Sequence, residues 1–298
     1  MLWLFKIASL LPLAVLHALG GVLGWAVWFF SSAYRKRFRS NSAQAGVAFH
    51  TARPAIAEAG RFVAELPRLW LRPLDESCMR NVQMQGLDIA SLAFAQGKGV
   101  VFFGPHCGSF ELGPQALAEV LGPEHGVVTA IYRPARQARL ASIELKARQR
   151  RYLSVLPASL SAIKSMHRAL KGGGSVALLT DQVPPVGQGV WAPFFGKPAY
   201  TMTLAARLAL QTGAALLPVS CERLPKGRGY IVKIWPAVDL PPDIDLLYTV
   251  TCINQALEAI VLSQPGQYLW GYGRYKVPRQ IPVSPPPTPQ APANKDAV

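Results

Sequence analysis

The stretch GVVFFGPHCGSFELG, residues 99–113, joins an unbroken apolar run to a histidine and a glutamate. Val100–Phe103 has the composition of a buried strand, and the spacing of apolar residues after it predicts a helix over residues 111–122. His106 therefore lies at the carboxyl end of a strand, and Glu111 follows five residues later. Reactive groups of α/β proteins gather at such strand ends, so this pair predicts a chemical role.

The rest of the middle of the chain alternates short apolar runs with helical segments. Strands separated by helices of ten or more residues predict an α/β layered domain with a mixed, largely parallel sheet flanked by helices. The expected strands are 100–103, 127–132, 175–179, 214–222 and 229–235, and the expected helices are 111–122, 135–151, 162–171, 201–213 and 245–264.

The amino terminus is apolar. Residues 7–30 contain no Asp, Glu, Lys or Arg and are followed by the basic run YRKRFR, residues 34–39. This length suffices for a membrane-spanning helix, and the basic flank predicts that its carboxyl end is cytoplasmic. Pro12 and nearby glycines weaken a clean span, so a helix lying in the interface is the alternative. Either way we expect a membrane anchor over residues 1–32.

Two further segments complete the expected organisation. Residues 33–279 form one catalytic domain, because no shift in composition divides them. The stretch PVSPPPTPQAPANKDAV closes the chain and is too rich in proline to pack a core. Residues 280–298 are therefore predicted to be a disordered tail.

Composition indicates the kind of partner. The chain has 298 residues, half of them hydrophobic, and Lys plus Arg exceed Asp plus Glu by 31 to 16. An apolar, strongly basic chain is typical of proteins on anionic membranes. Nucleic acid is the rival partner for such charge, but no zinc-finger spacing or RNP-like motif supports it. The four cysteines are widely separated, which predicts neither a disulfide framework nor a metal site.

The spacing of His106 and Glu111 constrains how they could cooperate. On one continuous helix, five residues would turn by about 500° and separate the two side chains. If His106 lies in the turn and the helix begins near Ser109, Glu111 can face the imidazole. The carboxylate would then fix the tautomer of a general base. The alternatives are a structural turn histidine with a favourable charge at a helix start, or a thiol nucleophile at Cys107.

Several motifs occur in order along the chain, and together they resemble the lipid A biosynthesis (late) acyltransferases. This family of lauroyl and myristoyl transferases lies within the membrane glycerolipid acyltransferases. The resemblance runs from the apolar amino terminus to about residue 278. The motifs are HCGSFE (106–111), IYRP (131–134), LLTDQ (178–182), GVWAPFFGKPAYT (189–201) and TGAALLPV (212–219).

The resemblance implies roles for particular residues. It implies that His106 deprotonates an acceptor hydroxyl with support from Glu111, and that Arg133 binds anionic substrate or steadies the oxyanion. Four further residues are implied to bind substrate: Asp181, Gln182, Phe195 and Gly196. The family's carboxyl-terminal histidine is missing from YLWGYGRYK, residues 268–276, so a role for it here is in doubt.

The resemblance also implies partners and location. The donor would be an acyl carrier protein thioester and the acceptor a phosphorylated Kdo-bearing lipid A precursor, with no metal or other cofactor. The protein would sit in the bacterial inner membrane with its catalytic domain on the cytoplasmic side. The basic residues within 133–151 could meet either partner. Another membrane lipid acceptor, with acyl-CoA as a possible donor, and a non-catalytic lipid-binding protein are the alternatives.

Overall fold

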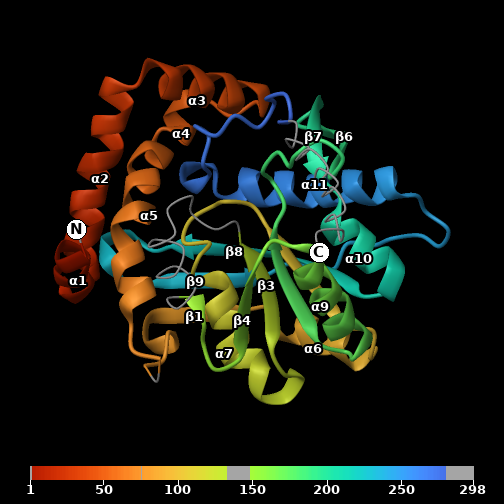
Figure 1. The fold of residues 1–298 in the computed structure, drawn as a ribbon. Helices are drawn as coiled ribbons and strands as arrows, with labels where there is room; N and C mark the ends of the chain where they lie inside the picture. Colours follow the sequence, from red (N-terminus) through yellow and green to blue (C-terminus); the bar gives the residue numbers. More distant parts are fainter. Residues whose placement is uncertain (1, 75, 133–147, 280–298) are drawn as a thin grey trace, which may run out of the picture.

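The computed structural model describes residues 2–74, 76–132 and 148–279, so the tail expected over 280–298 lies outside the described residues. Its centre is a seven-stranded sheet in the order β1-β9-β8-β2-β5-β3-β4, in which only the β8–β9 pair is antiparallel. The strands are β1 (Val82–Gln85), β2 (Val100–Gly104), β3 (Val128–Tyr132), β4 (Leu153–Pro157), β5 (Ser175–Leu179), β8 (Ala215–Arg223) and β9 (Tyr230–Ile234). The predicted α/β fold with a mixed, largely parallel sheet is confirmed (Figure 1).

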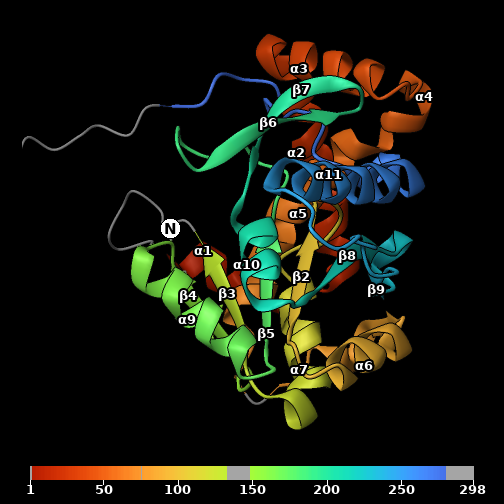
Figure 2. The ribbon, with the colours of Figure 1, turned by 90° about the vertical axis from the view of Figure 1, so that its right-hand side faces the viewer.

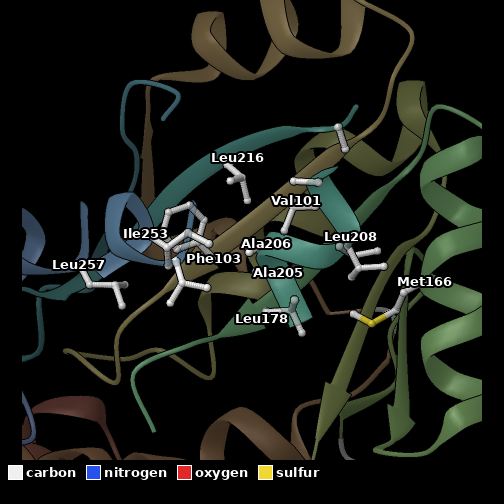
Figure 3. Close-up of a cluster of buried hydrophobic side chains, with 14 of the residues drawn as sticks. Val101, Phe103, Met166, Leu178, Ala205, Ala206, Leu208, Leu216, Ile253 and Leu257 are labelled. Atoms are coloured by element: carbon white, nitrogen blue, oxygen red, sulfur yellow. The ribbon is translucent and has the colours of Figure 1, made fainter. Parts of the chain in front are cut away.

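Helices cover both faces of the sheet, which is why β2 is apolar at every position. Val101 and Phe103 of β2 pack with the helices of one face, including Leu208 of α10 (Leu204–Thr212) and Leu257 of α11 (Leu246–Ser263) (Figure 3). The intervening Phe102 packs on the opposite face with α6 and α7. A strand buried on both faces needs such a continuous apolar run. These helices are α6 (Leu87–Ala95), α7 (Gly113–His125), α9 (Leu160–Lys171), α10 (Leu204–Thr212) and α11 (Leu246–Ser263).

Helix and strand boundaries depart from expectation at a few places. The helix predicted at residue 111 begins at Gly113 and continues through Pro123 to His125. Most of the helix expected over 135–151 lies outside the described residues, and at its end Arg150 forms a β-bridge with Leu153. The chain also contains strands β1 and β4 and a hairpin of β6 (Gly189–Phe194) and β7 (Lys197–Met202), none of which was predicted.

The apolar amino terminus forms two helices rather than one. They meet at Pro12, which lacks a backbone N–H and disfavours helix at the residue before it. The second helix packs along α5 through a seam of Gly20, Gly24 and Gly60, where the two backbones touch (Figure 1). The amino-terminal helices are α1 (Leu2–Leu10), α2 (Leu13–Phe30), α3 (Ser32–Gln44), α4 (Phe49–Ala52) and α5 (Pro54–Leu71).

Adding a methyl group at a glycine of the seam between α2 and α5 should destabilise the protein, because the two backbones touch there. A Cβ at Gly24 would collide with the backbone of Ile56, so Gly24→Ala is expected to lower the free energy of unfolding by about 1–3 kcal/mol. Gly21→Ala is the matched control, because its Cβ would make only ordinary contacts, with the Arg61 side chain at 3.6 Å and the Ala57 Cβ at 3.8 Å. Thermal unfolding of both variants checks this, and equal loss of stability in the two would contradict it.

The side of α2 turned away from α5 stays apolar and exposed. Phe30 is 91% exposed, and Leu19, Val22 and Phe29 on the same helix are also exposed. By length and composition, α2 and α11 are the two helices of the described residues that could cross a membrane. Each of these two helices is also partly buried inside the protein. The core helix of a soluble protein can have the same length and apolar composition.

Candidate active site

Two neighbouring strands bring the site together. β2 ends at Gly104, two residues before His106, and β5 ends at Leu179, two residues before Asp181. The strands are parallel and adjacent, with Gly104 in register with Leu179. The residues that follow them therefore meet at one edge of the sheet, as the sequence led us to expect of His106.

Asp181 and Gln182 hold the imidazole of His106 from its two sides. The Asp181 carboxylate lies 2.5 Å from the ring Nδ1 and also accepts the His106 backbone N–H at 3.0 Å. On the other side, the Gln182 amide nitrogen lies 3.1 Å from Nε2. An amide nitrogen can only donate, so Nε2 accepts and Nδ1 carries the proton. This is the tautomer that a general base acting through Nε2 requires.

Within the described residues Glu111 forms no hydrogen bond or ion pair with the imidazole, so the predicted contact between His106 and Glu111 is absent, while a catalytic role for Glu111 stays a prediction. Its carboxylate accepts two hydrogen bonds from Arg148, at 3.0 and 2.7 Å, and one from the Trp70 indole at 3.3 Å. The reason is local, because residues 109–112 form a turn and α7 begins only at Gly113. In that turn Phe110 faces the imidazole, with ring centroids 4.6 Å apart.

The surroundings of Asp181 keep its carboxyl group ionised. Burial alone would raise its pKa, since the side chain is almost inaccessible to water. The charge of His106, its hydrogen bonds to the carboxylate and the charge of Arg274 outweigh burial and lower the pKa. Arg274 is itself buried and donates to Thr201 and to the backbone oxygen of Tyr200. An ionised Asp181 can stabilise the imidazolium that forms when Nε2 takes a proton.

The turn after His106 also leaves backbone donors available. Within the described residues, the N–H groups of Phe110 and Glu111 donate to no acceptor. They precede α7, where the helix dipole favours negative charge. Donors of this kind can bind an oxygen on which negative charge develops.

The thiol of Cys107 is not placed as a nucleophile. Its side chain is buried beside Tyr268 and Trp270, and its sulfur lies 3.9 Å from the backbone oxygen of Gln264. Burial raises the pKa of this thiol far above its ordinary value. A neutral, enclosed thiol is typical of a core cysteine rather than a reactive one.

The other residues assigned by resemblance have different settings. Arg133 lies outside the described residues. Phe195 and Gly196 form the two-residue turn of the β6–β7 hairpin, both with positive φ. The Phe195 backbone N–H donates to Glu258 at 2.6 Å, and its carbonyl accepts from Gln44 at 2.8 Å. These contacts hold the hairpin turn in place and do not reach the imidazole.

Comparison with known proteins shows the family to which the chain belongs. The family described as bacterial lipid A biosynthesis acyltransferases matches residues 1–277. The chain belongs to this family. It is therefore an acyltransferase, and the family resemblance carried by its motifs is confirmed.

Curated relatives of the acyltransferase act on two kinds of lipid. The lipid A biosynthesis lauroyltransferase of Escherichia coli is 28% identical over 75% of this chain and 71% of its own length. The lipid A biosynthesis palmitoleoyltransferase of the same organism is 27% identical, over 73% and 68%. A phosphatidylinositol mannoside acyltransferase of Mycobacterium tuberculosis is 30% identical, over 66% of this chain and 59% of its own.

A buried ionic cluster supports the turn that carries His106 in this acyltransferase. Arg223 at the end of β8 donates twice to Glu65, at 2.9 and 2.6 Å, and once to Glu58 at 2.5 Å. The same guanidinium donates to the backbone oxygen of Gly108 at 3.2 Å. It thus joins helix α5 to the loop two residues beyond His106. Sequence reasoning missed this cluster, because nothing in the pattern connects charges on α5 and β8.

The cluster should make stability depend on pH through Glu65. Burial raises the pKa of Glu65, but the charge and hydrogen bonds of Arg223, with a hydrogen bond from His17, outweigh burial and lower it to about 2. The Tyr230 hydroxyl also donates to Glu65, and Glu58 accepts a hydrogen bond from the same Arg223. A folded-state pKa below the unfolded value of 4.5 gives stability that is present above pH 4.5 and is lost as pH falls toward 2.

Urea unfolding of the native protein and of Glu65→Gln checks this dependence. The difference between their free energies of unfolding should be largest near neutral pH and should narrow as pH falls below 4.5. A difference that stays constant over this range would show that Glu65 does not supply the effect.

Proposed function

We propose that this acyltransferase moves a fatty acyl chain from an acyl carrier protein thioester to a hydroxyl of a Kdo-bearing lipid A precursor. The observation that carries the proposal is the imidazole of His106, held with Nδ1 on Asp181 and with Nε2 accepting a hydrogen bond from the Gln182 amide. Membership in the lipid A biosynthesis acyltransferase family supports the choice of acceptor.

The reaction begins when the acceptor hydroxyl takes the place of the Gln182 amide at Nε2 of His106. Nε2 removes the hydroxyl proton as the oxygen attacks the thioester carbonyl carbon. The N–H groups of Phe110 and Glu111, with Arg133, stabilise the oxyanion of the tetrahedral intermediate. The intermediate then collapses, the C–S bond breaks, and the imidazolium returns its proton to the thiolate that leaves. Asp181 holds the ring throughout, and the acyl chain never bonds to the enzyme.

The amino-terminal helices bring the enzyme to its lipid. The exposed apolar side of α1 and α2, residues 2–30, enters the inner membrane. Four cations of α3 lie directly after it and contact anionic headgroups on the cytoplasmic side: Arg35, Lys36, Arg37 and Arg39. Residues 33–279 then form the catalytic domain against that membrane.

A mannosylated phospholipid is the second candidate acceptor. It is favoured by the 30% identity to a phosphatidylinositol mannoside acyltransferase. The same base, carboxylate and backbone donors would serve this reaction, since only the lipid that presents the hydroxyl differs.

A transfer assay with the purified full-length protein in detergent micelles separates these candidates. The donors are radiolabelled acyl carrier protein thioesters of several chain lengths and acyl-CoA, and the acceptors are Kdo-lipid A precursor, phosphatidylinositol mannoside and a lysophospholipid. We expect label in lipid A from the carrier protein donor. Label found only in phosphatidylinositol mannoside would show that the mannoside, and not the lipid A precursor, is the acceptor. Label transferred only from acyl-CoA would show that acyl-CoA, and not the carrier protein thioester, is the donor.

A further inference from the structure

A basic groove runs between helices α9 and α10 on the outside of the molecule. Its volume is about 560 Å³. Leu208 and Ile163 supply apolar surface, while the remaining side chains are polar or basic. The polar and basic lining residues are Lys164, His167, Arg168, Lys171 and Gln211.

Within the described residues, no acidic side chain pairs with the positive charge of this groove. Neither α9 nor α10 contains an acidic residue. Lys164, Arg168 and Lys171 are exposed, and none of them forms an ion pair within the described residues. A surface of a single charge sign attracts partners of the opposite sign and raises the rate of their association. The groove therefore fits an acidic partner.

The position of the groove distinguishes an acidic protein from an anionic membrane. In Figure 1 the apolar helices α1 and α2 lie at one side of the molecule, and α9 and α10 lie at the other. Figure 2, viewed from that other side, shows α9 and α10 in front of the sheet. A bilayer that receives α1 and α2 lies against the opposite side of the molecule. The groove thus faces a partner in solution.

Helix α9, which forms one wall of the groove, begins at the edge of the sheet where the reaction would occur. α9 starts three residues after the carboxyl end of β4, and Pro157 at that end is in register with Tyr132 of β3. β3 and β5 are parallel neighbours, so these ends share an edge with Asp181. A partner docked along α9 would therefore reach, at the amino-terminal end of this helix, the same edge of the sheet as His106 and Asp181.

We propose that the groove between α9 and α10 docks the acidic carrier protein that delivers the acyl thioester. This inference rests on the proposed function, because it assigns the surface that receives the donor of that reaction. Lys164, Arg168 and Lys171 meet acidic side chains of the carrier, and Ile163 provides a small apolar centre.

Charge reversal within the groove tests this assignment. Lys164→Glu and Arg168→Glu are each expected to lower kcat/KM for the acyl carrier protein thioester about tenfold at low salt, with a smaller effect at high salt. Transfer from acyl-pantetheine, which lacks the protein, should remain at the native rate. Arg80→Glu is the control, because Arg80 is exposed next to β1, far along the sheet from α9, and the change in net charge is the same.

The outcomes separate the docking surface from the reaction. Lys164→Ala, which keeps the helix and removes one charge, should give a smaller loss in the same direction. If both charge reversals match Arg80→Glu with the carrier protein donor, the groove is not its docking surface. Weaker binding of the variants to phosphatidylglycerol vesicles, with unchanged carrier kinetics, would assign the groove to lipid instead. Failure of the native protein to use the carrier donor at all would refute the proposed donor and the groove together.

Discussion

His106→Ala is expected to lower the turnover of acyl transfer by about two to four orders of magnitude, because it removes the general base. The imidazole Nε2 is the group placed to accept the hydroxyl proton, with Nδ1 held on Asp181. The ring is only 16% exposed, so bulk buffer has little access to replace it. Steady-state transfer from a labelled thioester donor to lipid measures the loss.

Stability and rescue show whether this loss is chemical. His106→Ala also takes the imidazole from the buried Asp181 carboxylate, which keeps the backbone N–H of residue 106, so its unfolding temperature should fall and transfer is compared at a temperature where the variant remains folded. Added imidazole should restore part of the activity if the missing group is a base. Undiminished transfer by His106→Ala would mean that the histidine is structural.

Asp181→Asn is expected to cause the second large loss, of about two orders of magnitude or more. The Asn amide nitrogen would donate to Nδ1 and force the proton onto Nε2, which then cannot act as a base. The negative charge that stabilises the imidazolium is removed as well. We expect kcat to fall while the KM values for donor and lipid change little, and kinetic assays in which each substrate is varied check this split. A loss confined to KM would indicate that Asp181 binds substrate instead.

Much of the fold follows from local patterns. The five expected strands are present as β2, β3, β5, β8 and β9, because each is a short, mainly apolar run between clear breaks. The β6–β7 hairpin was missed, since Pro193 and Pro198 within it argue against strands. The single expected amino-terminal helix is two helices because Pro12 interrupts it.

The site was predictable only in part. His106 was found from its place at a strand end, which local sequence reveals. Its carboxylate partner was not, because sequence spacing pointed to Glu111 whereas Asp181 is 75 residues away. The two meet because β5 pairs with β2, although β3 and β4 intervene in the chain. Strand order is a tertiary property, so no local pattern contains it.

The protonation of the His106 ring tests most directly that Asp181, and not Glu111, is the partner of the base. Only five histidines occur in the chain, so ¹⁵N-histidine labelling of the full-length protein in micelles gives few signals to assign. At neutral pH we predict Nδ1 protonated and Nε2 unprotonated in the native protein and in Glu111→Gln, whatever its turnover, with this tautomer lost in Asp181→Asn. A tautomer that survives Asp181→Asn and is lost in Glu111→Gln would contradict the account.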